Sequence, residues 1–382
     1  MRTAIRSSRI VTKDGVIPGY LLFEEGRILS VTEGEPACDE LIDEGDGIVM
    51  PGFIDIHTHG GGGHAFADSS AEEVALGCDF HLSHGTTAIM PTVSASTPEN
   101  MKLSLAAIGE AMERSLCAAH IIGAHLEGPY LAPEMCGAQC TDFITAPKPR
   151  DYEQIAKSLG KYIARWTFAP ETDEGSLFAK FLKSEGILAS IGHTGATYDA
   201  VKRAFDDGAR LVTHLYSCTS TVTRRGGFRS LGVIESTFLL DGMTAEIIAD
   251  GKHLPPELIS MILKIKGADK VIAVTDSISV AGSGISSGTM CGTDFIIEDG
   301  VAKLPDRSAF AGSVATADVL LRVLVFECGL SLPDASKLLS LNAAELLGLP
   351  KGSLEAGRDA DIVVLDEKLY PKSVFALGKR VK

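Results

Sequence analysis

The sequence predicts an α/β protein, a (β/α)₈ barrel joined to a small β-sandwich domain built from both termini. Three observations predict this fold class. From Pro51 onward, eight apolar strand-like runs alternate with helix-like stretches. Both ends of the chain contain short runs of alternating polarity instead. The length of 382 residues is enough for one barrel and an appendage.

The two ends of the chain are expected to form one small domain. Near the N-terminus, TAIRSSRIVT and YLLFEEGRILSV alternate as half-buried strands do, and IVVLDE near the C-terminus is again strand-like. We therefore predict a small β domain from residues 1–50 and 346–382, with a catalytic barrel over residues 51–345 inserted between them.

The barrel strands are expected where apolar runs recur. They are GFIDIHTH (52–59), TTAIMPTV (86–93), IIGAHLEG (121–128), YIARWTFAP (162–170), ILASIGHTG (187–195), ARLVTHLY (209–216), MTAEIIADG (243–251) and VIAVTDSIS (271–279). Strands that are apolar almost throughout favour a parallel sheet covered on both faces. Eight such units favour a closed barrel. An open doubly wound sheet is the competing fold, but no GxGxxG follows the first strand.

Helices are predicted between these strands, over residues 70–84, 97–115 and 197–208 among others. Ser70 and Thr97 precede two of them and are typical N-caps, and Pro98 occupies a permitted first-turn position.

Composition excludes several classes of protein. Fifty acidic residues against 35 basic ones give a net charge of −15, so the chain lacks the basic surface of a nucleic-acid binder. No apolar run approaches the roughly 20 residues that span a bilayer, and the first residues have no apolar core of a secretion signal. Eight scattered cysteines are typical of reduced thiols. We expect a cytoplasmic protein that binds neither membranes nor nucleic acid.

Polar residues interrupt the apolar runs at their C-terminal ends, which meet at one mouth of such a barrel. These residues are His57 and His59 on the first run, Glu127 on the third, His193 on the fifth, His214 on the sixth and Asp276 on the eighth. Residues two apart on a strand point the same way, so the first two histidines can hold one ion. Imidazoles with carboxylates suit zinc or iron(II), and Glu127 is placed to bridge two ions.

Other histidines have simpler interpretations. A lone histidine at a strand end is commonly a hydrogen-bonded core residue, and we interpret His125 as a core or supporting residue one layer deeper. We expect His64, His81, His84 and His120 to lie in loops or helices, and they receive no role. A non-catalytic metal-binding or structural barrel is an alternative for the whole set. Asp276 argues against it, because metal storage needs no general base.

The motifs occur in a telling order: PGFIDIHTHG, AHLEGPYLAP, GHTGAT, THLYS, IADGKH, VTDS, AGS, NAAELLGL and GSLEAGRDADIVVLD. In this order they resemble the amidohydrolase superfamily and, within it, the N-acetylglucosamine-6-phosphate deacetylases. The resemblance covers almost the whole chain. His-x-His is common throughout the superfamily, whereas HLEGPYL with GHTGAT and IADGKH is far more specific to the deacetylases.

The resemblance implies a role for each residue. Glu127, His193 and His214 would hold the main catalytic metal, and His57 and His59 would hold a second ion. Some deacetylases have Gln and Asn in place of this histidine pair and work with one metal. This sequence keeps both histidines, so a site for two ions, zinc or iron(II), is favoured over a site for one.

The implied reaction is hydrolysis of the N-acetyl group of N-acetylglucosamine 6-phosphate to glucosamine 6-phosphate and acetate. Asp276 would take a proton from water, whose pKa a divalent ion lowers to about 7, and pass it to the leaving amine. The simpler interpretation of Asp276 is a helix cap. His253 would contact the sugar phosphate, and Arg225 would reach the phosphate in a neighbouring subunit, which implies a homodimer. The alternative to phosphate binding is that Arg224 and Arg225 are a pair of solvated loop residues.

Three segments depart from the family. Gln139 replaces a usual histidine, and Ser217-Cys218-Thr219 stands where the family has Asn-Ala-Met. Arg225-Gly226-Gly227-Phe228 replaces Gly-Arg-Glu-Pro-Gly. All three lie where substrate is expected, so Gln139, Ser217 and Cys218 join the substrate-binding candidates. A related N-acyl amino sugar phosphate, such as N-acetylgalactosamine 6-phosphate, or another amide is therefore the alternative substrate.

Overall fold

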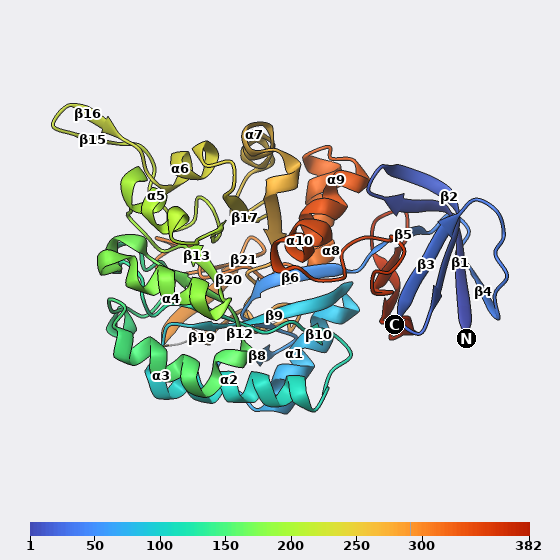
Figure 1. Cartoon of the computed structure of the whole chain (residues 1–382), viewed down its shortest axis with the longest axis horizontal. Coiled ribbons are helices and arrows are strands. Elements are labelled where there is room, and N and C mark those ends of the chain that lie inside the picture. Colours follow the sequence, from blue (N-terminus) through green and yellow to red (C-terminus); the bar gives the residue numbers. More distant parts are fainter. Residues whose placement is uncertain (291) are drawn as a thin grey trace.

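A computed structural model describes residues 1–290 and 292–382 of the chain. Within these residues, eight parallel strands surround a common axis (Figure 1). They are β6 (Phe53–Thr58), β9 (Thr86–Ser94), β11 (Ala124–Glu127), β12 (Ile163–Phe168), β13 (Leu188–Ile191), β14 (Leu211–Val212), β17 (Thr244–Ile248) and β18 (Val271–Val274), with the short β10 (His120–Ile121) beside β9. Seven of the eight barrel strands lie within the predicted apolar runs, and β9 extends one residue beyond its run, to Ser94.

The ends of the first and last strands close the barrel. The Asp276 N–H donates to the His57 carbonyl at 2.9 Å, and the His59 N–H donates to the Ser277 carbonyl at 2.8 Å. These bonds join the chain after β18 to β6, so the predicted (β/α)₈ barrel is confirmed and the open sheet is excluded.

Helices cover the outside of the barrel (Figure 1). Ser70 and Thr97 cap the first two through their side chains, as predicted, by accepting from the N–H groups of Glu73 and Asn100. The helices are α1 (Ala71–Ser83), α2 (Pro98–Glu113), α3 (Pro149–Leu159), α4 (Leu177–Glu185), α5 (Tyr198–Asp206), α6 (Val233–Leu239), α7 (Pro256–Lys266), α8 (Ala317–Arg322), α9 (Leu332–Ser336) and α10 (Asn342–Leu347).

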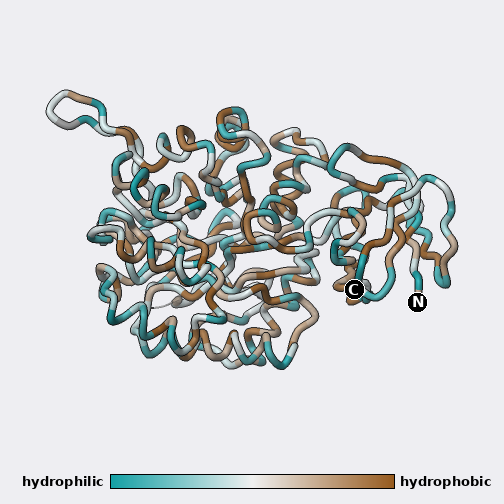
Figure 2. The backbone as a smooth tube through the Cα atoms, viewed as in Figure 1, coloured by the Kyte–Doolittle hydropathy of each residue, from teal (hydrophilic) through white to brown (hydrophobic). Residues whose placement is uncertain are grey.

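Apolar side chains fill both faces of the barrel wall, and hydrophobic segments follow its strands in Figure 2. One cluster inside the barrel combines Ile54, Met90 and Ile272 with Ala343 and Ala344 of α10. This packing fills one end of the barrel and leaves the polar strand ends at the other.

Strands from both termini pair in one sheet, as predicted. Its order is β24-β23-β22-β5-β1-β2-β3, with β4 also on β1. The strands are β1 (Arg2–Thr12), β2 (Gly15–Glu24), β3 (Arg27–Thr32), β4 (Glu40–Asp43), β5 (Ile48–Pro51), β22 (Ile362–Leu365), β23 (Pro371–Ala376) and β24 (Lys379–Arg380). The first half of β1 pairs with β4 and its second half with β5, so the sheet divides there and encloses its own core. The domain boundaries at residues 50 and 346 stay a prediction.

Among the described residues, two hairpins and one small three-stranded sheet, all antiparallel, lie outside the barrel sheet and the terminal sheet. The hairpin of β15 (Thr223–Arg225) and β16 (Phe228–Ser230) projects far from the body of the molecule (Figure 1). A small sheet contains β19 (Ser287–Met290), β20 (Thr293–Glu298) and β21 (Val301–Lys303), and β7 (Gly60–Gly61) pairs with β8 (His64–Ala65). In the part of the chain that the structure describes, no helix is long and apolar enough to cross a membrane.

Candidate metal centre

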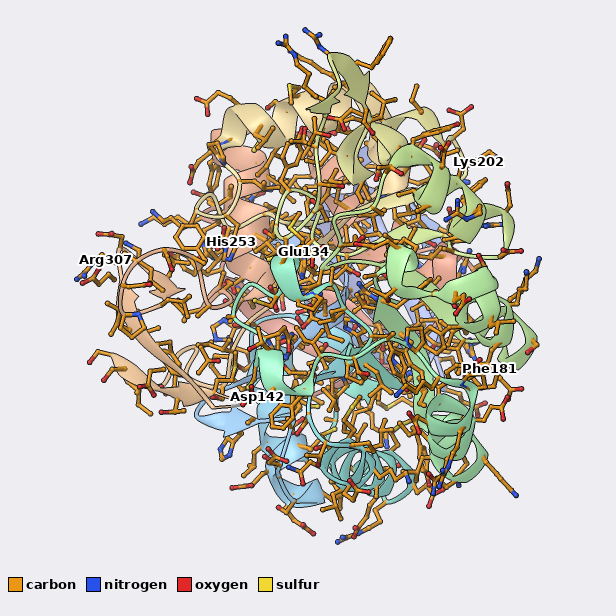
Figure 3. All side chains as sticks on the ribbon, turned by 90° about the vertical axis from the view of Figure 1, so that its left-hand side faces the viewer. Glu134, Asp142, Phe181, Lys202, His253 and Arg307 are labelled. Atoms are coloured by element: carbon orange, nitrogen blue, oxygen red, sulfur yellow. The ribbon has the colours of Figure 1, made fainter. Side chains whose placement is uncertain are left out.

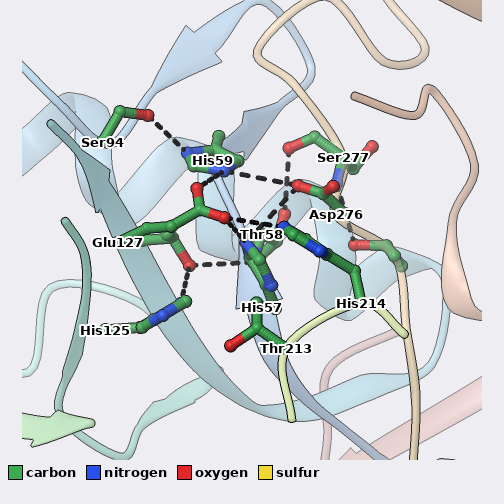
Figure 4. A network of polar contacts seen from close by, with 12 residues as sticks. His57, Thr58, His59, Ser94, His125, Glu127, Thr213, His214, Asp276 and Ser277 are labelled. Atoms are coloured by element: carbon green, nitrogen blue, oxygen red, sulfur yellow. Dashed lines mark hydrogen bonds and ion pairs between the residues drawn. The ribbon is translucent and has the colours of Figure 1, made fainter. Parts of the chain in front are cut away.

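The six polar residues at the strand ends meet in one place, and Figure 4 labels five of them, all but His193. They form two groups, and within each group the ligand atoms lie within 4.8 Å of one another. Each of the six residues is at most 8% exposed. The groups are Glu127 with His193 and His214, and His57 with His59 and Asp276. The structure therefore brings together every residue predicted to hold a metal or to transfer a proton.

Glu127 lies between the two groups. Its Oε1 is 3.0 Å from His193 Nε2 and 2.9 Å from His214 Nε2. Its Oε2 is 3.2 Å from His59 Nε2. Oε1 also lies 3.5 Å from His57 Nε2. The carboxylate of Glu127 therefore contacts both groups, with Oε1 touching members of each and Oε2 facing His59.

Asp276 faces the histidine pair. Its Oδ1 is 3.5 Å from His57 Nε2 and 3.3 Å from His59 Nε2. His57 lies near the end of β6 and His59 directly follows the strand, two residues on, so their rings reach the same side.

The other ring nitrogen of each histidine is anchored. His57 Nδ1 lies 2.8 Å from Glu246 Oε1 and His59 Nδ1 lies 3.1 Å from Ser94 Oγ. His193 Nδ1 and His214 Nδ1 lie 2.9 Å and 3.1 Å from the carbonyls of Met135 and Ser217. Where an acceptor binds Nδ1–H, the lone pair is left on Nε2, and this fixes the tautomer that binds metal.

The donor set fits a divalent ion. His57 Nε2 is buried without a hydrogen-bond partner among the described residues, although it faces Glu127 and Asp276. Burial alone favours the neutral ring, but the surrounding carboxylates raise the pKa of His57 to about 10. Burial also opposes ionisation of Asp276, yet the charge of His57 and the hydrogen bond from His59 lower its pKa to about 2. The cluster therefore attracts positive charge, and imidazole with carboxylate suits zinc or iron(II).

Strained backbone accompanies the site. His193, His214 and Asp276 have φ values of +48°, +28° and +46°. Left-handed backbone is uncommon for residues with a side chain, and it persists where surrounding structure enforces it. No local sequence signal marks these three positions for it.

Two charged residues beneath the site were missed by sequence reasoning. Arg165 of β12 and Glu246 of β17 are both fully buried and form an ion pair. The signal was available: each interrupts an apolar run at mid-strand, where a charge is costly unless it is paired.

A pocket of about 830 Å³ of empty space, partly open to solvent, lies above the centre. Gln139, Ser217, Cys218 and His253 line it together with Met290 and Phe310. The metal-centre residues that also line it are His59, Glu127, His193, His214 and Asp276. When the left-hand side of Figure 1 faces the viewer, Glu134 lies near the middle of the molecule with His253 beside it, and Arg307 lies at the edge (Figure 3). Of the predicted substrate-binding residues, only Arg225 lies elsewhere, in the projecting hairpin, and its side chain is outside the described part of the structure.

Gln139 is held more closely to the metal centre than its prediction as a substrate residue implied. Its Nε2 donates to Glu127 Oε2 at 2.7 Å, and its Oε1 accepts from the Ala95 N–H at 3.0 Å. His253 is held by Asp250, 2.8 Å from its Nδ1, and its ring packs against Phe310.

The remaining histidines lie outside the two groups. His125 is fully buried below them and contacts Thr92 and Thr167, as expected of a core residue. His81 lies in α1, and His84 follows its end. His64 and His120 lie in short strands rather than in the loops or helices expected for them.

Comparison with known protein families matches residues 48–381 to the amidohydrolase family. The chain belongs to the amidohydrolase family. Among curated amidohydrolase relatives, N-acetylglucosamine-6-phosphate deacetylase of Bacillus subtilis (strain 168) is 33% identical over 373 residues, covering 94% of this chain and 92% of the relative. The resemblance in the sequence motifs is thereby confirmed.

Solved structures agree with this placement in the amidohydrolase family. A mutant N-acetyl-D-glucosamine-6-phosphate deacetylase from Mycobacterium smegmatis, in complex with N-acetyl-D-glucosamine-6-phosphate, superposes with a TM-score of 0.92 at 30% identity, over 100% of this chain and 99% of that one. N-acetylgalactosamine-6-phosphate deacetylase of Escherichia coli O157:H7 is 26% identical and covers 99% of both chains.

Proposed function

We propose that this protein hydrolyses the N-acetyl group of N-acetylglucosamine 6-phosphate to glucosamine 6-phosphate and acetate. The observation that carries the proposal is the pair of ligand groups joined by Glu127, with Asp276 beside them at the floor of the pocket. Deacetylases with this substrate in their names match over nearly the whole chain.

In this proposal Glu127, His193 and His214 would hold one ion, and His57 and His59, beside Glu127, would hold a second. The ions would be zinc or iron(II), one or two per subunit. A bound divalent ion supplies Lewis acidity for the acyl carbonyl and lowers the pKa of water.

Asp276 is the proposed general acid and base. Its Oδ1 faces the histidine pair, and the residue lines the pocket. The carboxylate takes a proton from the attacking water and gives it to the departing nitrogen, without which the C–N bond breaks slowly. Hydrolysis of the amide in this way yields acetate and an amino sugar phosphate with a free amino group.

Substrate recognition is assigned to Gln139, Ser217, Cys218 and His253, which line the pocket. Among the described residues, the pocket lining contains no lysine or arginine. A phosphate there needs a cation from elsewhere, because the chain carries a net charge of −15. We assign this role to Arg225 of a second copy, whose projecting hairpin would reach the pocket of its partner in a homodimer.

The decisive experiment measures acetate release from N-acetylglucosamine 6-phosphate by the purified protein loaded with zinc or iron(II). N-acetylgalactosamine 6-phosphate is the comparison substrate, favoured by the altered 137–140 and 217–228 segments and by the Escherichia coli relative. Turnover of the gluco compound supports the proposal, and faster turnover of the galacto epimer would shift the assignment to the alternative. No acetate from either compound with any metal would refute both.

The dimer and the role of Arg225 have a separate test. Sedimentation should give twice the chain mass, and Arg225→Ala should raise KM for the phosphorylated sugar with little change in kcat. An unchanged KM would remove Arg225 from the site. Free thiols at the described cysteines support our further proposal that the protein works in the cytoplasm.

A further inference from the structure

We propose that Glu246 is a positioning residue that holds one histidine of each ligand group and thereby sets the affinity of the centre for both ions. Glu246 lies on β17 and is fully buried beneath the pocket floor. The inference rests on the proposed function insofar as the two groups must bind metal.

A single oxygen of Glu246 contacts both groups. Oε1 lies 2.8 Å from His57 Nδ1, on the histidine pair, and accepts the backbone N–H of His214 at 3.1 Å. Since His57 and His214 belong to different groups, this oxygen is a direct link between them beneath the proposed ions.

The two contacts act differently. At His57, a carboxylate accepting from Nδ1–H leaves the Nε2 lone pair facing Glu127 and Asp276, each 3.5 Å away. At His214, the bond secures a backbone whose φ of +28° is unfavourable for a residue with a side chain. Loss of the acceptor would therefore free a ring in one group and a strained backbone in the other.

Arg165 keeps this carboxylate charged and in place. One guanidinium nitrogen of Arg165, Nη1, pairs with Glu246 and also donates to the Ile56 carbonyl at 3.1 Å. The other, Nη2, donates to Thr213 Oγ1 at 2.9 Å. Ile56 and Thr213 directly precede His57 and His214. Arg165 therefore hydrogen-bonds the residue before each of the two histidines that Glu246 contacts.

The test compares two double variants that both remove the buried ion pair. Glu246→Gln with Arg165→Met keeps a hydrogen-bond acceptor at position 246, whereas Glu246→Leu with Arg165→Met removes it. Apolar replacement of a buried ion pair is often tolerated. Zinc stoichiometry is measured by elemental analysis, and zinc affinity by competition with a chelator.

We expect the Gln double variant to bind two zinc ions within about tenfold of the wild-type affinity. The Leu double variant should lose about 10-fold to 100-fold in affinity for each ion, the usual effect of losing a partner of a ligating histidine. Equal zinc affinity in the two double variants would overturn the proposal.

The single variant Glu246→Gln gives a second measurement if a double variant does not fold. Its amide cannot accept from His57 and His214 without turning its NH₂ group toward Arg165, so it must show the same loss. Asp318→Asn is the matched control, because it removes a buried carboxylate paired with Arg322 at 2.8 Å outside the pocket lining. It should bind zinc as the wild type does. A wild-type protein that binds no zinc would refute the proposed function instead.

Discussion

Gly137→Ala tests how tightly the pocket loop is packed against the metal centre. Gly137 has a φ of +59°, and a Cβ there would lie 2.6 Å from Cys218 Sγ and 3.6 Å from His193 Cε1. Left-handed backbone costs alanine about 1 kcal/mol, and forcing an extra methyl group into a packed site costs about 1–3 kcal/mol more. Cys218 would have to move, and its thiol interacts with the ring of His193, which is a proposed ligand.

The expected result is a lower free energy of unfolding, by about 2–4 kcal/mol in urea titrations, and weaker zinc binding. Each 1.4 kcal/mol transmitted to His193 corresponds to about a tenfold loss of affinity. Gly186→Ala is the matched control, since Gly186 has a φ of +70° and a Cβ added there would have no atom within 4 Å. Adding Cys218→Ala to Gly137→Ala should relieve the clash and leave only the backbone cost. Equal destabilisation by the two single variants, with unchanged zinc affinity, would refute this reasoning.

Further predictions address the proton carrier, the metal and the charged core. Asp276→Asn should keep bound zinc while acetate release falls by about 10²–10⁴-fold, as expected for loss of a general acid and base; unchanged turnover would exclude that role. Gln139→Leu removes the donor to Glu127 Oε2 and should weaken zinc binding by about tenfold, measured by chelator competition with wild type as reference. Removing metal by dialysis against a chelator should lower the thermal midpoint, and zinc at about 100 times its Kd should restore about 2.7 kcal/mol; a midpoint that ignores zinc would contradict a built metal site. For Asp318, burial by itself would raise the pKa, but hydrogen bonds from His84 and Thr316 lower it from 3.8 to about 2. Asp318→Asn should therefore cost about 2 kcal/mol at pH 7. Because the folded-state pKa is depressed, this difference is full above pH 3.8 and must close as the pH falls from 3.8 toward 2, which urea titrations across that range would show.

Much of the site was predictable because its signals are local. The His57 and His59 spacing follows from the two-residue period of a strand, and Glu127, His193 and His214 each end an apolar run. Parallel strands in a barrel bring such ends to one mouth, so fold class alone placed these side chains near one another.

The ion pair between Arg165 and Glu246, below the candidate metal centre, was not predictable in the same way. Arg165 and Glu246 are 81 residues apart and meet because β12 and β17 present them to the same interior layer. A mid-strand charge in the sequence indicates that a partner exists, but the register between non-adjacent strands decides which residue it is.

The sequence by itself determined the barrel strands, the caps of α1 and α2 and the ligand types, because period, capping chemistry and metal preference are properties of a few neighbouring residues. Only the tertiary structure decided that Gln139 binds Glu127, that the β15–β16 hairpin leaves the body of the molecule, and that His193, His214 and Asp276 take left-handed backbone. These features depend on contacts between distant segments, whose geometry is set only when the barrel closes.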